Sequence, residues 1–276
     1  MSDDFESPLR RVLPGRGGRF ALYAANLAVI VFLFAPLAVI VLVSFSAGEY
    51  LTFPPRGFTW VWYGRMLSAD GFLESLWLSA RLGAAVALLS LALGITAALG
   101  LASHGLRGRT LLTALILSPL VVPSLVTGIA LLQFFRTWDV RSPFWMLLLG
   151  HVVITVPYVI RTVGASLDLF DWSLVDTARV LGAGPVRAFL RVTLPLIRPG
   201  IAAGGIFAFL VSFDNFTISM FLHAAEYTPL PIRLFQYMEA IMDPTVAAIS
   251  AFLIFLSFCI LVVTEKLVGI RRIGRL

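Results

Sequence analysis

Six segments of the sequence are apolar for long enough to cross a lipid bilayer, and no other feature constrains the fold as strongly. A helix rises about 1.5 Å per residue, so about 20 apolar residues span the hydrocarbon core. Hydrophobic residues make up 59% of the 276 residues and charged residues only 13%, which is more apolar than a typical soluble domain. The segments are Phe20 to Phe45, Leu76 to Ser103, Thr110 to Phe135, Phe144 to Leu167, Pro199 to Leu222 and Pro244 to Val268. We therefore expect an all-α integral membrane protein with six transmembrane helices.

Basic residues predict how these helices are oriented, because cytoplasmic connections carry an excess of Lys and Arg. They gather before the first segment, after the second, in the fourth connection and after the sixth. They are Arg10, Arg11, Arg16 and Arg19, then Arg107 and Arg109, then Arg161, Arg179, Arg187, Arg191 and Arg198, and finally Lys266, Arg271, Arg272 and Arg275. We expect cytoplasmic tails at residues 1–19 and 269–276 around a transmembrane domain at 20–268. Topology also accounts for the net charge of +6, so nucleic acid is not an expected partner.

The first apolar segment follows a cluster of arginines, as the core of a signal peptide does. Its apolar stretch exceeds the usual 7 to 15 residues, so we expect a retained helix. The outer connection behind it, residues 47–75, holds Trp60, Trp62 and Tyr63. Such aromatic residues are typical of a membrane interface, with contact to an external partner as the alternative.

The fourth connection, residues 168–198, is longer than two adjacent spans require. Ser173 is a plausible N-cap for a short helix that ends near Leu181, with Asp176 at the positive end of its dipole. Gly182 and the Gly184-Pro185 pair interrupt that helix. A second helix is expected from Val186 to Val192, ended by Leu194-Pro195. The sequence therefore predicts two short helices joined by a tight turn at the cytoplasmic face.

Residues of this connection resemble the cytoplasmic signature of the permeases of ATP-binding-cassette (ABC) importers. That signature has an acid and two small residues, a Gly four residues later, and a closing β-branched residue, any residue, Leu and Pro. The matching residues are Asp176, Thr177, Ala178, Gly182, Val192, Leu194 and Pro195. Asp stands for the usual Glu, and Thr for the first Ala. The resemblance implies a coupling helix that docks on an ATPase subunit, with Asp176 and Arg179 as contact candidates. The alternative is an amphipathic helix on lipid headgroups.

Further residues resemble the spermidine/putrescine branch of these permeases. They are the run from Ser212 to Ser219, Leu230-Pro231-Ile232, and the run from Ala247 to Ser250. The resemblance implies a multi-pass protein of the bacterial inner membrane that works with a second homologous permease, two ATPase subunits and an extracytoplasmic solute-binding protein. ATP would be bound by the ATPase subunits, and this chain would hold no cofactor. The resemblance implies that this chain forms half of the pathway for a polyamine, and the alternative is another small organic solute such as an amino-acid derivative or opine.

One acid, Asp214, lies well inside the fifth apolar segment. A carboxylate at such depth costs about 2.5 to 3.5 kcal/mol and is by default a functional candidate. On this expected helix, Asp214 and Thr217 share a face that Ser212, Asn215 and Ser219 flank. Phe213 and Phe216 would lie near enough for cation-π contact. We expect this stripe either to line the solute pathway or to pin the helix to a neighbour.

The fourth segment carries a second polar stripe, His151, Thr155, Tyr158 and Thr162, spaced by four, three and four residues. One helix face therefore holds all four. Packing between helices is the favoured role, and lining of the pathway is the alternative, with His151 and Tyr158 as pathway candidates. Pro157 predicts a kink in this helix.

Several motifs that carry enzymatic chemistry are missing from the sequence. The single lysine, Lys266, is not part of a phosphate-binding Gly-Lys-Ser/Thr motif, and no His-Glu-x-x-His or Gly-x-Ser-x-Gly motif occurs. The histidines His104, His151 and His223 fall at different predicted depths, so we expect no metal site. The chain is not expected to be an enzyme. A secondary transporter or channel that works alone is the remaining rival, and the signature from Asp176 to Pro195 argues against it.

Overall fold

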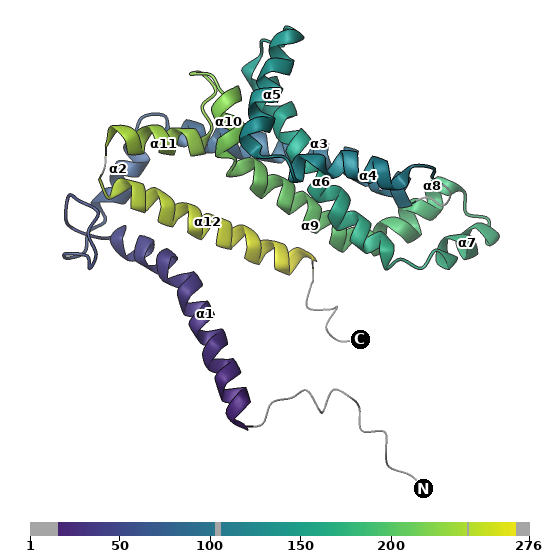
Figure 1. Cartoon of the computed structure of the whole chain (residues 1–276), viewed down its shortest axis with the longest axis horizontal. Coiled ribbons are helices and arrows are strands. Elements are labelled where there is room, and N and C mark those ends of the chain that lie inside the picture. The colour runs from purple at the N-terminus through teal and green to yellow at the C-terminus, as the bar shows by residue number, and fades with distance from the viewer. Residues whose placement is uncertain (1–15, 103–105, 242, 269–276) are drawn as a thin grey trace. The chain divides into compact units, whose positions relative to one another are not determined.

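The computed structural model describes residues 16–102, 106–241 and 243–268, which form helices linked by short connections (Figure 1). The helices are α1 (Arg16–Val43), α2 (Val61–Ser68), α3 (Phe72–Ala102), α4 (Arg109–Leu117), α5 (Ser124–Thr137), α6 (Pro143–Asp168), α7 (Ser173–Val180), α8 (Pro185–Ala188), α9 (Leu194–Phe213), α10 (Phe216–Leu222), α11 (Leu230–Ala240) and α12 (Thr245–Val268). The chain divides into two compact units, residues 1–65 with 242–254 and residues 66–241 with 255–276. Among the described residues no β-strand forms, which confirms the all-helical prediction.

In the part of the chain that the structure describes, four helices are long and apolar enough to cross a membrane: Phe20–Val43, Phe72–Ala102, Pro143–Asp168 and Pro185–Phe213. A fifth candidate is a bent pair, Arg109–Leu120 with Ser124–Thr137, whose two parts meet at 99°. Pro119 and Pro123 flank the bend because proline lacks a backbone N–H and disrupts the preceding turn. The last expected segment forms α12, and its part Thr245–Ile260 is an apolar helix shorter than the four candidate spans.

The larger unit is built around α3, α6 and α9, which pack against one another along their lengths (Figure 1). Val159 and Val163 of α6 and Ile197 of α9 are fully buried in one half of this core. Gly94 and Gly204 lie directly against Val159, where an added Cβ would come within 2.6 and 3.4 Å of its side chain. Small residues therefore let these three helices approach closely, as is usual in membrane proteins.

In the smaller unit, the segment after α1 folds back over the end of that helix. Trp62 is only 4% exposed, and its Nε1 donates a hydrogen bond to the carbonyl oxygen of Ser46 at 2.6 Å. Tyr63 and Trp60 pack on Phe45, with ring centroids 5.2 and 4.8 Å away. Trp62 is therefore a core residue of this unit, whereas Trp60 is largely exposed, and the placement of these aromatic residues at a membrane interface stays a prediction.

Candidate functional site

The connection between α6 and α9 begins with an aspartate that organises α7. The Asp171 carboxylate accepts a hydrogen bond from the Ser173 N–H at 3.0 Å, and hydrogen bonding by the Ser173 side chain and by this N–H lowers the pKa of Asp171. Trp172 occupies the N-cap position in helical geometry and makes no side-chain cap. The predicted Ser173 cap is therefore wrong by one position, since Ser173 is the first residue of α7 and the polar acceptor comes from Asp171 before it.

A glycine turn closes α7. Gly182 has a φ of +85°, a conformation that L-residues with a Cβ rarely adopt. Its N–H bonds the carbonyl oxygen of Arg179, and the N–H of Ala183 bonds that of Ala178. This pair of bonds is the Schellman motif, which satisfies the last carbonyl groups of a helix. The turn predicted at Gly182 is confirmed.

The two short helices have one packed side and one open side. Val175 and Ala188 are buried against the core of α3, α6 and α9, and Ala178 packs there partly. On the other side Val180 is 87% and Leu181 is 82% exposed. Exposed apolar patches mark surfaces that meet another protein or a membrane. The connection is thus held firmly by the bundle and presents a small apolar face away from it.

The signature residues lie on both sides of this element. Asp176, Thr177 and Arg179 are exposed, and the Arg179 guanidinium lies 3.9 Å from the Asp176 carboxylate. An exposed pair of this kind contributes little to stability, so both charges are accessible to a partner. Val192, Leu194 and Pro195 are half-buried at the other end of the connection.

The second short helix does not end at Leu194-Pro195, contrary to the prediction. A π-helical turn, Phe189–Thr193, joins α8 to α9, and the N–H of Leu194 bonds the carbonyl oxygen of Phe189. Proline is accepted here because the wider turn changes the bonding register just before it. As a result one helical run of 29 residues, Pro185–Phe213, leads from the connection into the bundle.

The fifth expected segment is broken at Asp214 and Asn215. The helix α9 ends at Phe213, and the Asn215 side chain accepts a hydrogen bond from the N–H of Ile218 at 2.8 Å, which caps α10. The predicted single face holding Asp214 and Thr217 is therefore wrong, because Asp and Asn favour the ends of helices. Asp214 is exposed, and among the described residues its carboxylate has no ion-pair partner within 4 Å.

His151 of α6 contacts both helices that flank this break. The side chain is fully buried, with Nδ1 2.9 Å from Ser212 Oγ of α9 and Nε2 3.2 Å from Ser219 Oγ of α10. The structure thus brings together two serines of the fifth segment and the histidine of the fourth, a pairing that the sequence analysis missed. The seven-residue spacing of the two serines was the available signal.

The other residues of the α6 stripe differ in burial. Thr155 is buried and lies 2.7 Å from Ser90 Oγ of α3. Tyr158 is half-buried and stacks on Phe207, with ring centroids 6.4 Å apart. Thr162 bonds its own helix and lies against Gly204. These contacts favour a packing role for His151 and Thr155.

Among the candidate pathway residues at the break between α9 and α10, Phe213 is buried, and Asn215 and Thr217 are half-buried.

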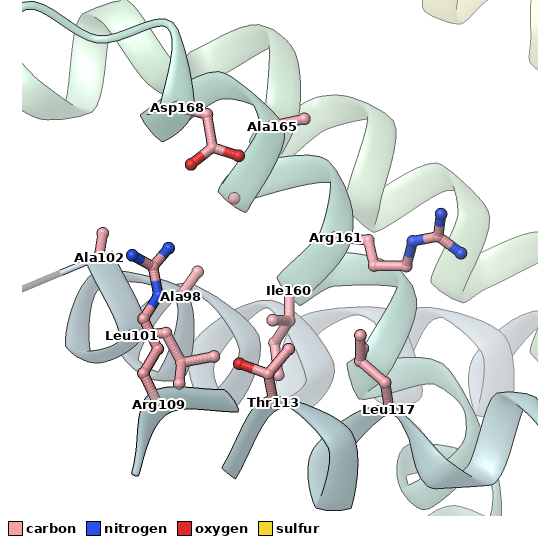
Figure 2. Close-up of a pocket in the computed structure, with 11 residues that line it drawn as sticks. Ala98, Leu101, Ala102, Arg109, Thr113, Leu117, Ile160, Arg161, Ala165 and Asp168 are labelled. Atoms are coloured by element: carbon pink, nitrogen blue, oxygen red, sulfur yellow. The ribbon is translucent and has the colours of Figure 1, made fainter. Parts of the chain in front are cut away.

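Cavities lie near both ends of α6 in the larger unit. One of about 240 Å³ lies between α3, α4 and the end of α6 that leads to α7 (Figure 2). The other, of about 400 Å³, is lined by Arg136, Asp139, Arg141 and His223 near the start of α6. Among the described residues no group of three His, Cys, Asp or Glu side chains could hold a metal ion. Residues 1–15 of the predicted N-terminal tail 1–19, the predicted C-terminal tail 269–276 and His104 fall outside the described residues.

Comparison with known proteins places the chain among transport proteins. Residues 90–268 match the model of the family described as binding-protein-dependent transport system inner membrane component. The spermidine/putrescine transport system permease protein PotC of Haemophilus influenzae is 29% identical over 90% of this chain and 96% of its own length. The putrescine transport system permease protein PotI of Escherichia coli is 30% identical over 81% of this chain and 82% of its own length. In fold, a chain of a bacterial ABC transporter that imports alginate aligns with a TM-score of 0.70 at 18% identity, over 92% and 98% of the two chains.

Proposed function

This chain belongs to the family of binding-protein-dependent transport system inner membrane components, and from that premise we propose that it forms half of the pathway of a polyamine importer, moved by an ATPase through residues 173–195. The observation that carries the proposal is the helical connection between the exposed helix α7 and the fifth apolar segment. The exposed helix α7 and the run Pro185–Phe213 connect the open apolar face at Val180 and Leu181 with the break at Asp214.

In the proposed mechanism an ATPase subunit docks on the exposed side of α7. Asp176, Arg179 and the apolar pair Val180 and Leu181 meet its surface, while Val175 and Ala188 fix the element to the bundle. Closure of two ATPase subunits on ATP pushes the connection, and the stiff helical run carries the displacement into α9. A packed helix transmits force better than a loop because it has few alternative conformations.

The full assembly proposed is this chain, a second homologous permease, two ATPase subunits and an extracytoplasmic solute-binding protein. Permeases of this family work with a binding protein, and ATP is bound by the ATPases of such systems. We assign six spans to this chain, with α12 as the last and the bent pair α4 and α5 as the third. Both termini then lie in the cytoplasm, as the distribution of arginines predicts, around the transmembrane domain at 20–268.

Polyamines are the proposed solutes because two relatives with 29 and 30% identity are named for spermidine and putrescine transport. The exposed Asp214 carboxylate provides a counter-charge for a cation, at the C-terminal end of α9 where the helix dipole is also negative. Asn215 and Thr217 add polar groups beside it, Phe213 and Tyr158 supply aromatic walls, and His151 orders the break. An amino-acid derivative or opine stays as the alternative solute.

The test is ATPase stimulation of the complete complex in lipid vesicles by binding protein loaded with spermidine or putrescine. We expect stimulation in the wild type and a clear loss in Asp214→Asn, since removing one charge-assisted contact costs about 1.5 to 3 kcal/mol of binding energy. The exposed Asp70, which lies between α2 and α3, supplies the matched control Asp70→Asn, for which we expect stimulation equal to the wild type. No response to polyamines from an otherwise active complex would remove the solute assignment and leave the permease role.

A further inference from the structure

The cavity between α3, α4 and the end of α6 is open to solvent and has the exposed charged residues Arg109, Arg161 and Asp168 in its lining. Its floor is apolar, formed by Ala98 and Leu101 of α3 and Ile160 of α6, all of which are buried. Gly164 also lines it, and a Cβ added there would meet nothing within 4 Å. At about 240 Å³ the cavity can hold a small polar group, since one water occupies about 30 Å³ in the liquid.

A positive and a negative side chain, Arg109 of α4 and Asp168 of α6, line this cavity from different helices. Figure 2 shows Arg109 of α4 and Asp168 of α6 directed towards the same end of the cavity, while the guanidinium of Arg161 extends away from it. Among the described residues neither Arg109 nor Asp168 forms an ion pair within 4 Å. Both charges are therefore available to one ligand.

The start of α4 adds a second attraction for an anion. Arg109 is its first residue, and the N-cap Gly108 offers no side-chain hydrogen bond to the first turn. The uncapped N–H groups of a helix start carry a partial positive charge. Thr113, one turn further along α4, contributes a hydroxyl to the lining.

We propose that this cavity binds a zwitterionic phosphoethanolamine group, with its phosphate at Arg109 and the start of α4 and its ammonium at Asp168. A simple anion would meet the Asp168 carboxylate unfavourably, and a simple cation would meet Arg109. A ligand that carries both charges a few atoms apart satisfies both residues.

A phospholipid headgroup is the source that the surroundings favour. The outer face of α4 is apolar, with Leu111 and Leu115 65% and 60% exposed, so acyl chains can lie along it beside the cavity. Basic pockets between helices on the cytoplasmic side are recognised lipid headgroup sites. The proposal rests on the proposed function only for placing this end of α6 at the cytoplasmic leaflet.

Lipid retention by the purified importer complex, measured by native mass spectrometry, tests the proposal. The complex is taken from vesicles of phosphatidylcholine mixed with phosphatidylethanolamine or with phosphatidylglycerol. The variants are Arg109→Gln and Asp168→Asn, with Arg107→Gln as control because Arg107 is an exposed neighbour that does not line the cavity. Size-exclusion chromatography checks assembly, and Arg109→Lys keeps the charge if the glutamine variant fails to assemble.

We expect Arg109→Gln to lower the retention of both lipids by about threefold, the effect of one partly exposed charge contact. Asp168→Asn should lower phosphatidylethanolamine by about threefold without lowering phosphatidylglycerol, and Arg107→Gln should change neither. Equal retention in all variants would overturn the site. A wild type that prefers phosphatidylglycerol, unaffected by Asp168→Asn, would overturn the zwitterionic ligand.

A parallel arm separates the two sources of the headgroup. Soluble phosphoethanolamine is added to the complex in vesicles that lack phosphatidylethanolamine. Its retention with the same dependence on Arg109 and Asp168 would support the chemistry and identify a free ligand. No retention, together with the lipid result, supports the membrane source. Because the readout is bound mass rather than transport, failure of the polyamine assignment would not alter either outcome.

Discussion

At the residue scale, His151 decides between packing and pathway for the α6 stripe. Replacing it with phenylalanine removes both ring nitrogens and leaves the Ser212 and Ser219 hydroxyls without their partner. We expect a loss of stability of about 1 to 3 kcal/mol, the cost of unsatisfied buried groups. Thermal unfolding of the purified permease in detergent measures it, beside transport.

Two variants of the same stripe serve as comparisons. His151→Gln keeps a donor and an acceptor, so it should recover part of the stability. Tyr158→Phe removes a hydroxyl from a half-buried ring that stacks on Phe207, and its melting temperature should stay near that of the wild type. Unchanged melting of His151→Phe together with lost transport would assign His151 to the pathway instead.

The sequence predicted this stripe but not its partners. The spacing of His151 and Thr155 placed them on one helix face, and both lie on that face and are buried. Which helices would supply Ser90, Ser212 and Ser219 depends on how α3, α9 and α10 pack against α6, and the spacing of polar residues within one helix does not identify the helices beside it. The same limit hid the approach of Arg109 and Asp168.

At the element scale, the Gly182 turn offers a test of the connection as a stiff lever. Gly182→Ala adds a Cβ at a φ of +85° with open space around it, so its whole effect is backbone strain, of about 1 to 2 kcal/mol. We expect faster hydrogen exchange across α7 and weaker coupling, measured as solute transported per ATP hydrolysed.

The control is two residues away in the same turn. Gly184 also has nothing within 4 Å of an added Cβ, but its φ is −66°, which alanine adopts readily. Gly184→Ala should therefore match the wild type in exchange and coupling. An equal loss in both variants would mean that side-chain volume at the ATPase surface matters, rather than the shape of the turn.

Apolar runs predicted the long helices well and their interruptions poorly. The expected segment from Phe144 to Leu167 corresponds to α6, Pro143–Asp168, because burial and length alone set such an element. Pro195 was expected to end a helix, and the π-helical turn before it let the helix continue. Asp214 was expected inside a helix, and the cap at Asn215 ended one instead. Such local hydrogen bonds compete with apolar periodicity, which does not detect them.

At the scale of the whole molecule, the bent pair α4 and α5 determines how many times the chain crosses the membrane. If the pair is one span, Arg107 before it and Asp139 after it lie on opposite sides. If the pair turns back at the 99° bend, both lie on the same side. The arginine distribution favours a full crossing, since Arg107 belongs to a basic connection and the outer ones are poorer in arginine.

Labelling of single introduced cysteines tests whether the bent pair crosses the membrane. Cys259 is the only native cysteine, so Cys259→Ser gives a background without cysteine. We expect a membrane-impermeant maleimide to label Asp139→Cys in intact spheroplasts and to label Arg107→Cys only after the membrane is permeabilised. Arg187→Cys in the α7–α9 connection is the cytoplasmic reference and Glu226→Cys the outer one. Labelling of Asp139→Cys with the pattern of Arg107→Cys, and of Arg187→Cys with the opposite pattern, would make the bent pair a re-entrant loop, because α6 separates Asp139 from Arg187. The termini would then lie on opposite sides, which would require a new account of how the 173–195 element meets an ATPase.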